Sequence, residues 1–150
     1  MIFSPTGGTR KVADVITKHW NFAVETDFSQ YIFKMENVIL IALPSYGGLV
    51  PGNQANCILV CVYGNRVYGD TLVEMKDVAR ESSFEIVAAI SAIAEHSVMH
   101  QYAAGRPEAE DLSQLEAFAS LIKEKLDSSQ KFGEIHLLGK HPYKRQVVLD

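Results

Sequence analysis

The chain has 150 residues, of which 47% are hydrophobic and 21% charged, and its formal net charge at pH 7 is −4. This is the size of one domain and the composition of an ordinary globular protein, which excludes an intrinsically disordered chain. An acidic balance without a basic stripe argues against general nucleic-acid binding. No stretch reaches the apolar length of about 20 residues that a membrane helix needs.

Strand and helix patterns alternate along the chain. Apolar residues at steps of three or four predict helices, and short β-branched runs that are apolar throughout predict strands buried on both faces. In chain order the predicted elements are a helix from about Thr9 to Trp20, an edge strand at Ala23–Asp27, strands at Val38–Leu43 and Cys57–Tyr63, a helix at Tyr68–Ser82, a strand at Phe84–Ile90, a helix from about Pro107 to Leu126, and an edge strand near Glu134–Leu138. This order predicts a doubly wound α/β fold around a parallel sheet.

The two cysteines and the paired histidines predict no disulfide and no metal site. Cys57 and Cys61 would lie about 13 Å apart on one strand, too far for a disulfide, and are interpreted as inert core residues. With no secretory leader at the N-terminus, this predicts a cytoplasmic protein. His96 and His100 are expected at the exit from a strand rather than on a helix, which disfavours a metal pair.

The loop before the first helix has the residues of a phosphate cradle. In open α/β sheets, ligands bind beside the carboxyl ends of the strands. Gly7 and Gly8 let successive N–H groups point inward, Ser4, Thr6 and Thr9 add hydroxyl groups, and the helix N-terminus favours an anion. The alternative interpretation is an ordinary capped helix start, where the same residue types are common.

Three loops together resemble those of the flavodoxin family. The pattern Ser-x-Thr-Gly-x-Thr from Ser4 to Thr9 resembles the flavodoxin phosphate loop, and the run from Pro44 to Gly48 resembles the second, flavin-contacting loop. In the third loop of short flavodoxins a stacking Tyr follows a Gly by four residues, a spacing that Gly64 and Tyr68 keep.

Two further runs resemble one branch of that family. Glu95-His96-Ser97 and Ala104-Gly105-Arg106-Pro107 are similar to runs in the flavodoxin halves of bacterial flavodoxin–ferredoxin fusion proteins. The ferredoxin half, with its closely spaced cysteines, is absent from this chain.

The resemblance implies a flavodoxin-like three-layer sandwich of about five strands that binds FMN non-covalently. It implies an electron carrier rather than a self-contained oxidoreductase, with no catalytic side chain. Tyr68 is the first choice for the ring that stacks on the flavin, and Tyr46 the second. The implied cofactor-binding residues are Ser4, Thr6, Gly7, Gly8, Thr9, Ser45, Tyr46, Gly47, Gly48, Gly64, Asn65, Tyr68, Gly69 and Asp70.

The implied partners are redox proteins, either a reductase or a ferredoxin-type protein, with no nucleic acid and no membrane. A homo-oligomer is a further possibility. Two other functions stay open: a flavodoxin-like binding or regulatory module that has lost FMN, and an FMN-dependent NAD(P)H or quinone oxidoreductase.

Residues 1–150 are expected to form one domain with two short segments and a tail at 139–150. Only Met1–Phe3 precede the first loop, and residues 44–56 leave little room for a crossover helix, since a whole crossover normally takes at least about 10–12 residues. Either the protein is trimmed at these points or the natural chain has segments that this sequence lacks. A bare crossover would expose apolar side chains of Val38–Leu43 or Cys57–Val62, and such a patch would favour self-association.

Overall fold

A computed structural model of the chain describes residues 7–18, 38–44, 56–64, 67–82, 84–96, 98–128 and 132–143, and for 38–44 it describes the backbone only. Its elements in chain order are α1 (Gly8–Thr17), β1 (Val38–Pro44), β2 (Asn56–Tyr63), α2 (Thr71–Glu81), β3 (Glu85–Ile93) and α3 (Ala109–Asp127). Several sequence-based predictions lie outside the described residues, namely the edge strand at 23–27, the crossover at 45–55 and the site residues Ser4, Thr6, Ser45, Tyr46, Gly47, Gly48 and Asn65.

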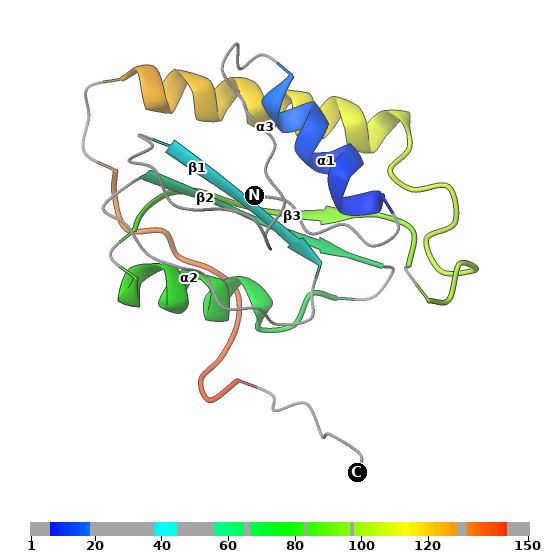
Figure 1. Ribbon diagram of the computed structural model, residues 1–150, viewed down its shortest axis with the longest axis horizontal. Coiled ribbons are helices and arrows are strands. Elements are labelled where there is room, and N and C mark those ends of the chain that lie inside the picture. The colour runs from blue at the N-terminus through cyan, green and yellow to red at the C-terminus, as the bar shows by residue number, and fades with distance from the viewer. Residues whose placement is uncertain are drawn as a thin grey trace, which may run out of the picture.

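The three described strands form a parallel sheet in the order β1-β2-β3 (Figure 1). The register pairs Val38 with Asn56 and Asn56 with Glu85 at the amino end. Parallel strands that lie in one sheet between helices must be apolar on both faces, which is why their sequences read as unbroken apolar runs. The prediction of an α/β fold with a parallel sheet is therefore confirmed for the described part of the chain.

The side chains of β2 alternate between two cores. Ile58, Val60 and Val62 face a core that α1 and α3 complete, which we call the α1/α3 core. Cys57, Leu59 and Cys61 face the opposite way and belong to a second core with Leu72, Met75 and Ala79 of α2, which we call the α2 core. Figure 1 shows α1 and α3 on one side of the sheet and α2 on the other.

The β2 strand is covered on both faces. The short crossover had predicted an exposed apolar face on either Val38–Leu43 or Cys57–Val62. Residues 57–61 are fully buried and Val62 is 6% exposed. The expectation that Cys57–Val62 would present an apolar surface is therefore wrong, because α1, α2 and α3 cover these positions. The side chains of Val38–Leu43 lie outside the described set.

A lysine of α3 donates a hydrogen bond to the backbone of β3 at a bulge. The register of β2 and β3 shifts between Cys57 and Ile58, so that Val87 is an extra residue on β3. Such a bulge leaves a backbone group without its ladder partner. The Lys125 ammonium donates to the Val87 carbonyl oxygen at 2.6 Å.

The start of α3 is set by its capping residues rather than by the proline. The helix begins at Ala109, two residues after Pro107. Glu108 is the N-cap, its side chain accepts from the backbone N–H of Asp111, and the Asp111 carboxylate accepts from the Glu108 N–H at 2.8 Å. This reciprocal capping box satisfies two amides that the helix itself leaves unpaired.

The segment 132–143 is extended but is not a strand. The predicted edge strand near Glu134–Leu138 is wrong, because no strand is assigned there. The alternating pattern that suggested a strand has another cause: Ile135 and Leu137 pack against the α2 core, while Glu134, His136 and Leu138 face solvent. The segment covers the side of α2 instead of adding to the sheet.

Candidate functional site

The candidate site lies at the carboxyl ends of the strands, where α1 begins. Gly7 is the N-cap residue of α1 and has a φ of 84°, a conformation that favours glycine. The first hydrogen bond that links the helix to its N-cap runs from Lys11 N to Gly7 O at 3.1 Å, so the amides of Gly8 and Thr9 lie ahead of it. The first turn carries no acidic residue. This end of α1 is electrostatically suited to an anion.

Two glycines lie close to the segment that follows β3. A Cβ atom placed on Gly8 would lie 3.1 Å from the Ala94 Cβ atom and 3.9 Å from the Glu95 carbonyl oxygen. A Cβ atom placed on Gly64 would lie 2.7 Å from the His96 Cβ atom and 2.8 Å from its Cα atom, closer than real Cβ contacts come. The start of α1 and the loop after β2 therefore meet at the segment that follows β3.

The loop after β2 places Tyr68 at the rim of the α2 core. The ring of Tyr68 is half-buried, with its centroid 5.7 Å from that of Tyr63 and the planes tilted by 59°. Gly69 follows with a φ of 57°, and Asp70 is the N-cap residue of α2. Asp70 Oδ1 accepts a hydrogen bond from the backbone N–H of Lys140 at 3.0 Å.

The described members of the predicted site are only partly in the expected roles. Gly7 and Gly69 have positive φ values and Gly64 has no room for a Cβ atom, so these three positions favour glycine, whereas Gly8 has an ordinary helical conformation. Thr9, expected to offer its hydroxyl group to a ligand, is only 4% exposed. Its place in the second position of the helix turns it toward the core.

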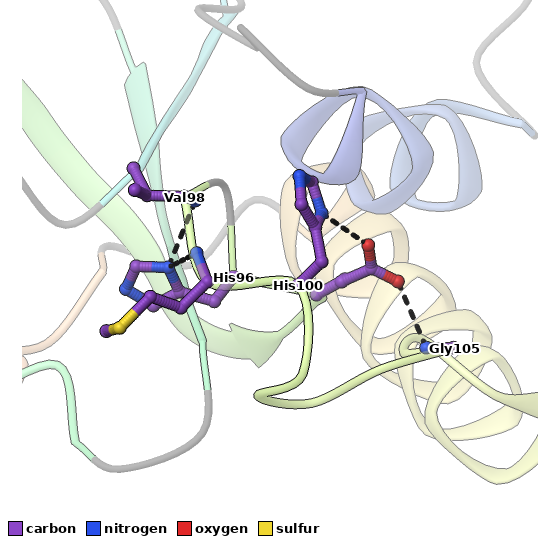
Figure 2. A network of polar contacts seen from close by, with 6 residues as sticks. His96, Val98, His100 and Gly105 are labelled. Atoms are coloured by element: carbon purple, nitrogen blue, oxygen red, sulfur yellow. Dashed lines mark hydrogen bonds and ion pairs between the residues drawn. The ribbon is translucent and has the colours of Figure 1, made fainter.

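The loop between β3 and α3 carries a polar network beside the start of α1 (Figure 2). The residues of this network are not among the predicted site residues. One carboxylate oxygen of Glu95 lies 2.7 Å from Nδ1 of His100, and the other accepts from the Gly105 N–H at 3.2 Å. The Gly105 amide, followed by His100 and the positive charge of Lys11, lowers the pKa of Glu95. Figure 2 shows the His100 ring beside the first turn of α1, the element that carries Lys11.

His96 bonds to backbone amides of the loop that follows it. Its Nδ1 atom accepts hydrogen bonds from the amides of Val98 and Met99 at 3.2 and 3.1 Å, which places the proton of a neutral ring on Nε2. The ring meets Tyr102 edge-on, with centroids 6.3 Å apart. Among the described residues, no group of three His, Cys, Asp or Glu side chains is arranged to hold a metal ion.

The residues around this network are conspicuous in the sequence, but no role in the site is predicted for them. The runs around Glu95 and Gly105 stand out by resemblance, yet spacing alone does not predict that a carboxylate reaches across ten residues to an amide. The turn at Ala103, with a φ of 51°, brings Gly105 back toward Glu95.

The buried cysteines have no nucleophilic role in this site. Cys57 and Cys61 are free and fully buried. Burial raises the pKa of each thiol to about 12, so both stay protonated at neutral pH. The prediction that they are core residues is confirmed.

The start of α3 should be sensitive to acid. Arg106 forms a bidentate ion pair with Asp111, and this pair lowers the pKa of the Asp111 carboxyl. Because the pKa is lower in the folded chain, the stabilisation is present above about pH 4, the ordinary value for Asp, and is lost as the pH falls through the folded pKa. We expect the melting temperature to fall as the pH is lowered from about 4 through the folded pKa of Asp111, and to fall less in Asp111→Asn.

The control for this prediction is Asp127→Asn. Asp127 pairs with Lys123 at 2.8 Å, but both side chains are more than half exposed, so the pair contributes little. Circular dichroism melts at stepped pH give the measurement. Equal acid sensitivity in Asp111→Asn and the unmodified chain would show that the Arg106 pair does not stabilise the folded state.

Comparison with protein-family models, curated proteins and solved structures finds no match. Among the described residues, no helix is both long and apolar enough to cross a membrane.

Proposed function

We propose that this chain is a flavodoxin-like protein that binds FMN non-covalently and carries electrons between redox partner proteins. The observation that carries the proposal is that the start of α1 and the loop after β2 both lie close to the exit of β3. A Cβ atom would lie 3.1 Å from the Ala94 Cβ atom if placed on Gly8, and 2.7 Å from the His96 Cβ atom if placed on Gly64. This places the amino end of α1 and the Tyr68 loop at one edge of a parallel sheet. Ligands of open α/β sheets bind at that edge.

The arrangement of elements supports the finer fold. Helices lie on both faces of the described strands, with α1 and α3 together on one of them. In the proposed doubly wound sandwich of about five strands, the remaining strands continue the sheet beyond β1. These strands would come from segments outside the described residues.

The described residues fit the chemical parts of FMN. The Gly8 and Thr9 amides at a helix start without acidic residues suit a phosphate. The half-buried ring of Tyr68 offers an aromatic surface of the kind that a flat ring system packs against. FMN, when bound, supplies the redox chemistry, and the chain binds and orients it and leaves an edge accessible to a partner.

A binding module without FMN is the second candidate, and two observations favour it. The side chain of Thr9 is buried rather than turned to a ligand, and Asp70 bonds to the backbone of Lys140. Both residues belong to the set that the flavodoxin resemblance implies for FMN. This candidate predicts a folded protein that binds no flavin.

The decisive experiment is a binding comparison of FMN and riboflavin. We expect the purified protein to show the visible absorption bands of flavin, or to bind added FMN with quenched flavin fluorescence. Riboflavin, which lacks the phosphate, should bind at least about tenfold more weakly if the α1 cradle holds that group. A protein that is folded by circular dichroism and binds neither compound would favour the second candidate. Reduction of a quinone by NAD(P)H without a partner would instead identify an oxidoreductase.

Tyr68→Ala should weaken FMN binding by about 1–3 kcal/mol, because a partly buried aromatic contact is removed. Tyr68→Phe keeps the ring and should bind FMN about as well as the unmodified chain. Titration of flavin fluorescence measures both variants. Unchanged affinity and quenching in Tyr68→Ala would leave Tyr68 as a rim residue of the α2 core and shift the proposed stacking role to Tyr46.

A further inference from the structure

The segment 132–143 crosses from one core to the other. Phe132 packs against the α1/α3 core, whereas Ile135 and Leu137 pack against the α2 core. In Figure 1 this segment descends from the end of α3 and runs beside α2. Its apolar anchors alternate with exposed residues, so only one of its sides is attached to the protein.

Polar contacts join this segment to α2 from one end of the helix to the other. Arg80, in the last turn, lies 3.4 Å from the Glu134 carboxylate, and Asp70, at the N-cap, accepts from the Lys140 amide at 3.0 Å. Between them, Asp77 accepts from the Tyr143 hydroxyl group and lies 3.4 Å from Nε2 of His141. Exposed ion pairs are weak, so the apolar anchors and the Asp70 and Tyr143 contacts are the main attachments.

Gly139 is the point of closest approach. A Cβ atom at this position would overlap the Val73 side chain, which belongs to the first turn of α2, and the glycine has a φ of 152°. A residue with a side chain would therefore push the segment away from the helix start. Gly133, in the same segment, has no heavy atom within 4 Å of a Cβ position.

We propose that residues 132–143 are a latch that holds the start of α2 and thereby positions the Tyr68 loop. Asp70, which the latch grips, is two residues from Tyr68, and the Thr71 amide bonds to the Tyr68 carbonyl at 3.2 Å. A fixed Asp70 therefore restricts the turn that carries the Tyr68 ring. Release of the latch would remove the Lys140 contact from Asp70 and leave this turn less restricted.

The latch also has a titratable contact at its far end. Burial, followed by the hydrogen bond to Asp77 and by the negative charges of Asp77, Glu74 and Glu81, raises the pKa of Tyr143 to about 12. Because the pKa is higher in the folded chain, the contact is fully present below about pH 10, the ordinary tyrosine value, and is lost as the pH rises through 12. His141 faces the same carboxylate.

Gly139→Ala should open the latch, and Gly133→Ala is its matched control. Hydrogen exchange followed by mass spectrometry on the full chain should show about tenfold faster exchange in residues 67–72 and 134–143 of Gly139→Ala. The Gly133→Ala variant should match the unmodified protein, and α3 should keep its protection in both. Unchanged exchange at 67–72 in Gly139→Ala, with or without faster exchange in 134–143, would overturn the proposal.

A second pair of variants keeps the test open if Gly139→Ala fails to fold. Leu137→Ala removes a half-buried anchor, and Leu138→Ala removes a neighbour that is 80% exposed. We expect faster exchange at residues 67–72 in the first variant only. Equal exchange in the two variants would overturn the latch.

The consequence for flavin rests on the proposed function, whereas the latch itself does not. If the Tyr68 loop binds FMN, Gly139→Ala should weaken that binding by about tenfold while Gly133→Ala does not. Faster loop exchange with unchanged FMN affinity supports the latch and contradicts the proposed place of Tyr68 in the flavin site. Unchanged exchange in a protein that binds FMN overturns the latch and leaves the flavin proposal intact.

Discussion

Leu59→Ala is expected to lower the free energy of unfolding by about 2–5 kcal/mol, the range for removing a large side chain from a packed core. Leu59 is fully buried in the middle of β2. Its side chain packs in the α2 core, which includes Leu72 and Met75. Since β2 is the central described strand, the surrounding side chains have little freedom to fill the space left by the missing atoms. Denaturant unfolding followed by circular dichroism gives the measurement.

The matched control is Leu121→Ala on α3. Leu121 is 60% exposed, so its truncation should change the free energy of unfolding by no more than about 0.5 kcal/mol. A similar small loss in both variants would mean that the α2 side of the sheet is not packed as described. That result would also revive the prediction of an uncovered sheet face next to the short crossover.

The strands were predictable because their burial on both faces leaves an unbroken apolar run. β2 begins at Asn56, one residue from the predicted start, and ends as predicted at Tyr63. β3 was harder, because Ser91 interrupts its apolar run and the predicted end fell at Ile90. Ser91 is exposed, as a polar residue on a strand at the border of the described sheet can be, so the strand continues to Ile93.

The segment near Glu134–Leu138 shows where periodicity reaches its limit. Alternating apolar residues indicate an extended chain with one buried side, and the structure has such a chain there. Periodicity does not specify whether the backbone joins a sheet ladder or lies on a helix. The neighbouring Gly139 allows the chain to approach Val73 closely. Predicting this contact requires the position of α2 in the folded protein.

The candidate site was predictable in its glycines and less so in its polar side chains. Gly7 and Gly69 have positive φ values, and Gly64 has no space for a Cβ atom, requirements that a Gly-rich loop signals locally. Glu95 and Asp70 accept hydrogen bonds from backbone amides 10 and 70 positions away in the chain. Such contacts depend on how loops and tail fold back, which no local pattern encodes.

Gly64→Ala should cost about 1–3 kcal/mol of folding free energy, the usual penalty for forcing extra volume into a packed site. The added Cβ atom would meet not only the His96 side chain but also its Cα atom, at 2.8 Å, so rotation of one side chain cannot relieve the overlap. Either the loop after β2 or the exit of β3 has to move. Because the Ala94 amide donates to the Tyr63 carbonyl at 2.9 Å, that movement would strain a hydrogen bond between these two segments.

Gly8→Ala is the graded comparison at the other side of the β3 exit. Its Cβ atom would lie 3.1 Å from the Ala94 methyl group, a tight contact that a shift of a few tenths of an ångström relieves. Alanine also favours the helical conformation that Gly8 adopts, by about 1 kcal/mol over glycine. The variant should therefore be close to neutral. Equal losses of stability in Gly8→Ala and Gly64→Ala would show that the β3 exit yields easily and that the two loops do not fix its position.

The same pair of variants tests whether the contact between the loop after β2 and the exit of β3 positions residues of the proposed FMN site. Displacing the loop after β2 would move Tyr68 relative to the amino end of α1, so Gly64→Ala should weaken FMN binding by at least about tenfold. Gly8→Ala keeps its backbone amide and should lose much less affinity for FMN. Stability is measured without flavin and affinity by fluorescence titration, so the two effects are separated. A Gly64→Ala variant that is destabilised yet binds FMN as tightly as the unmodified chain would confine the role of this contact to folding.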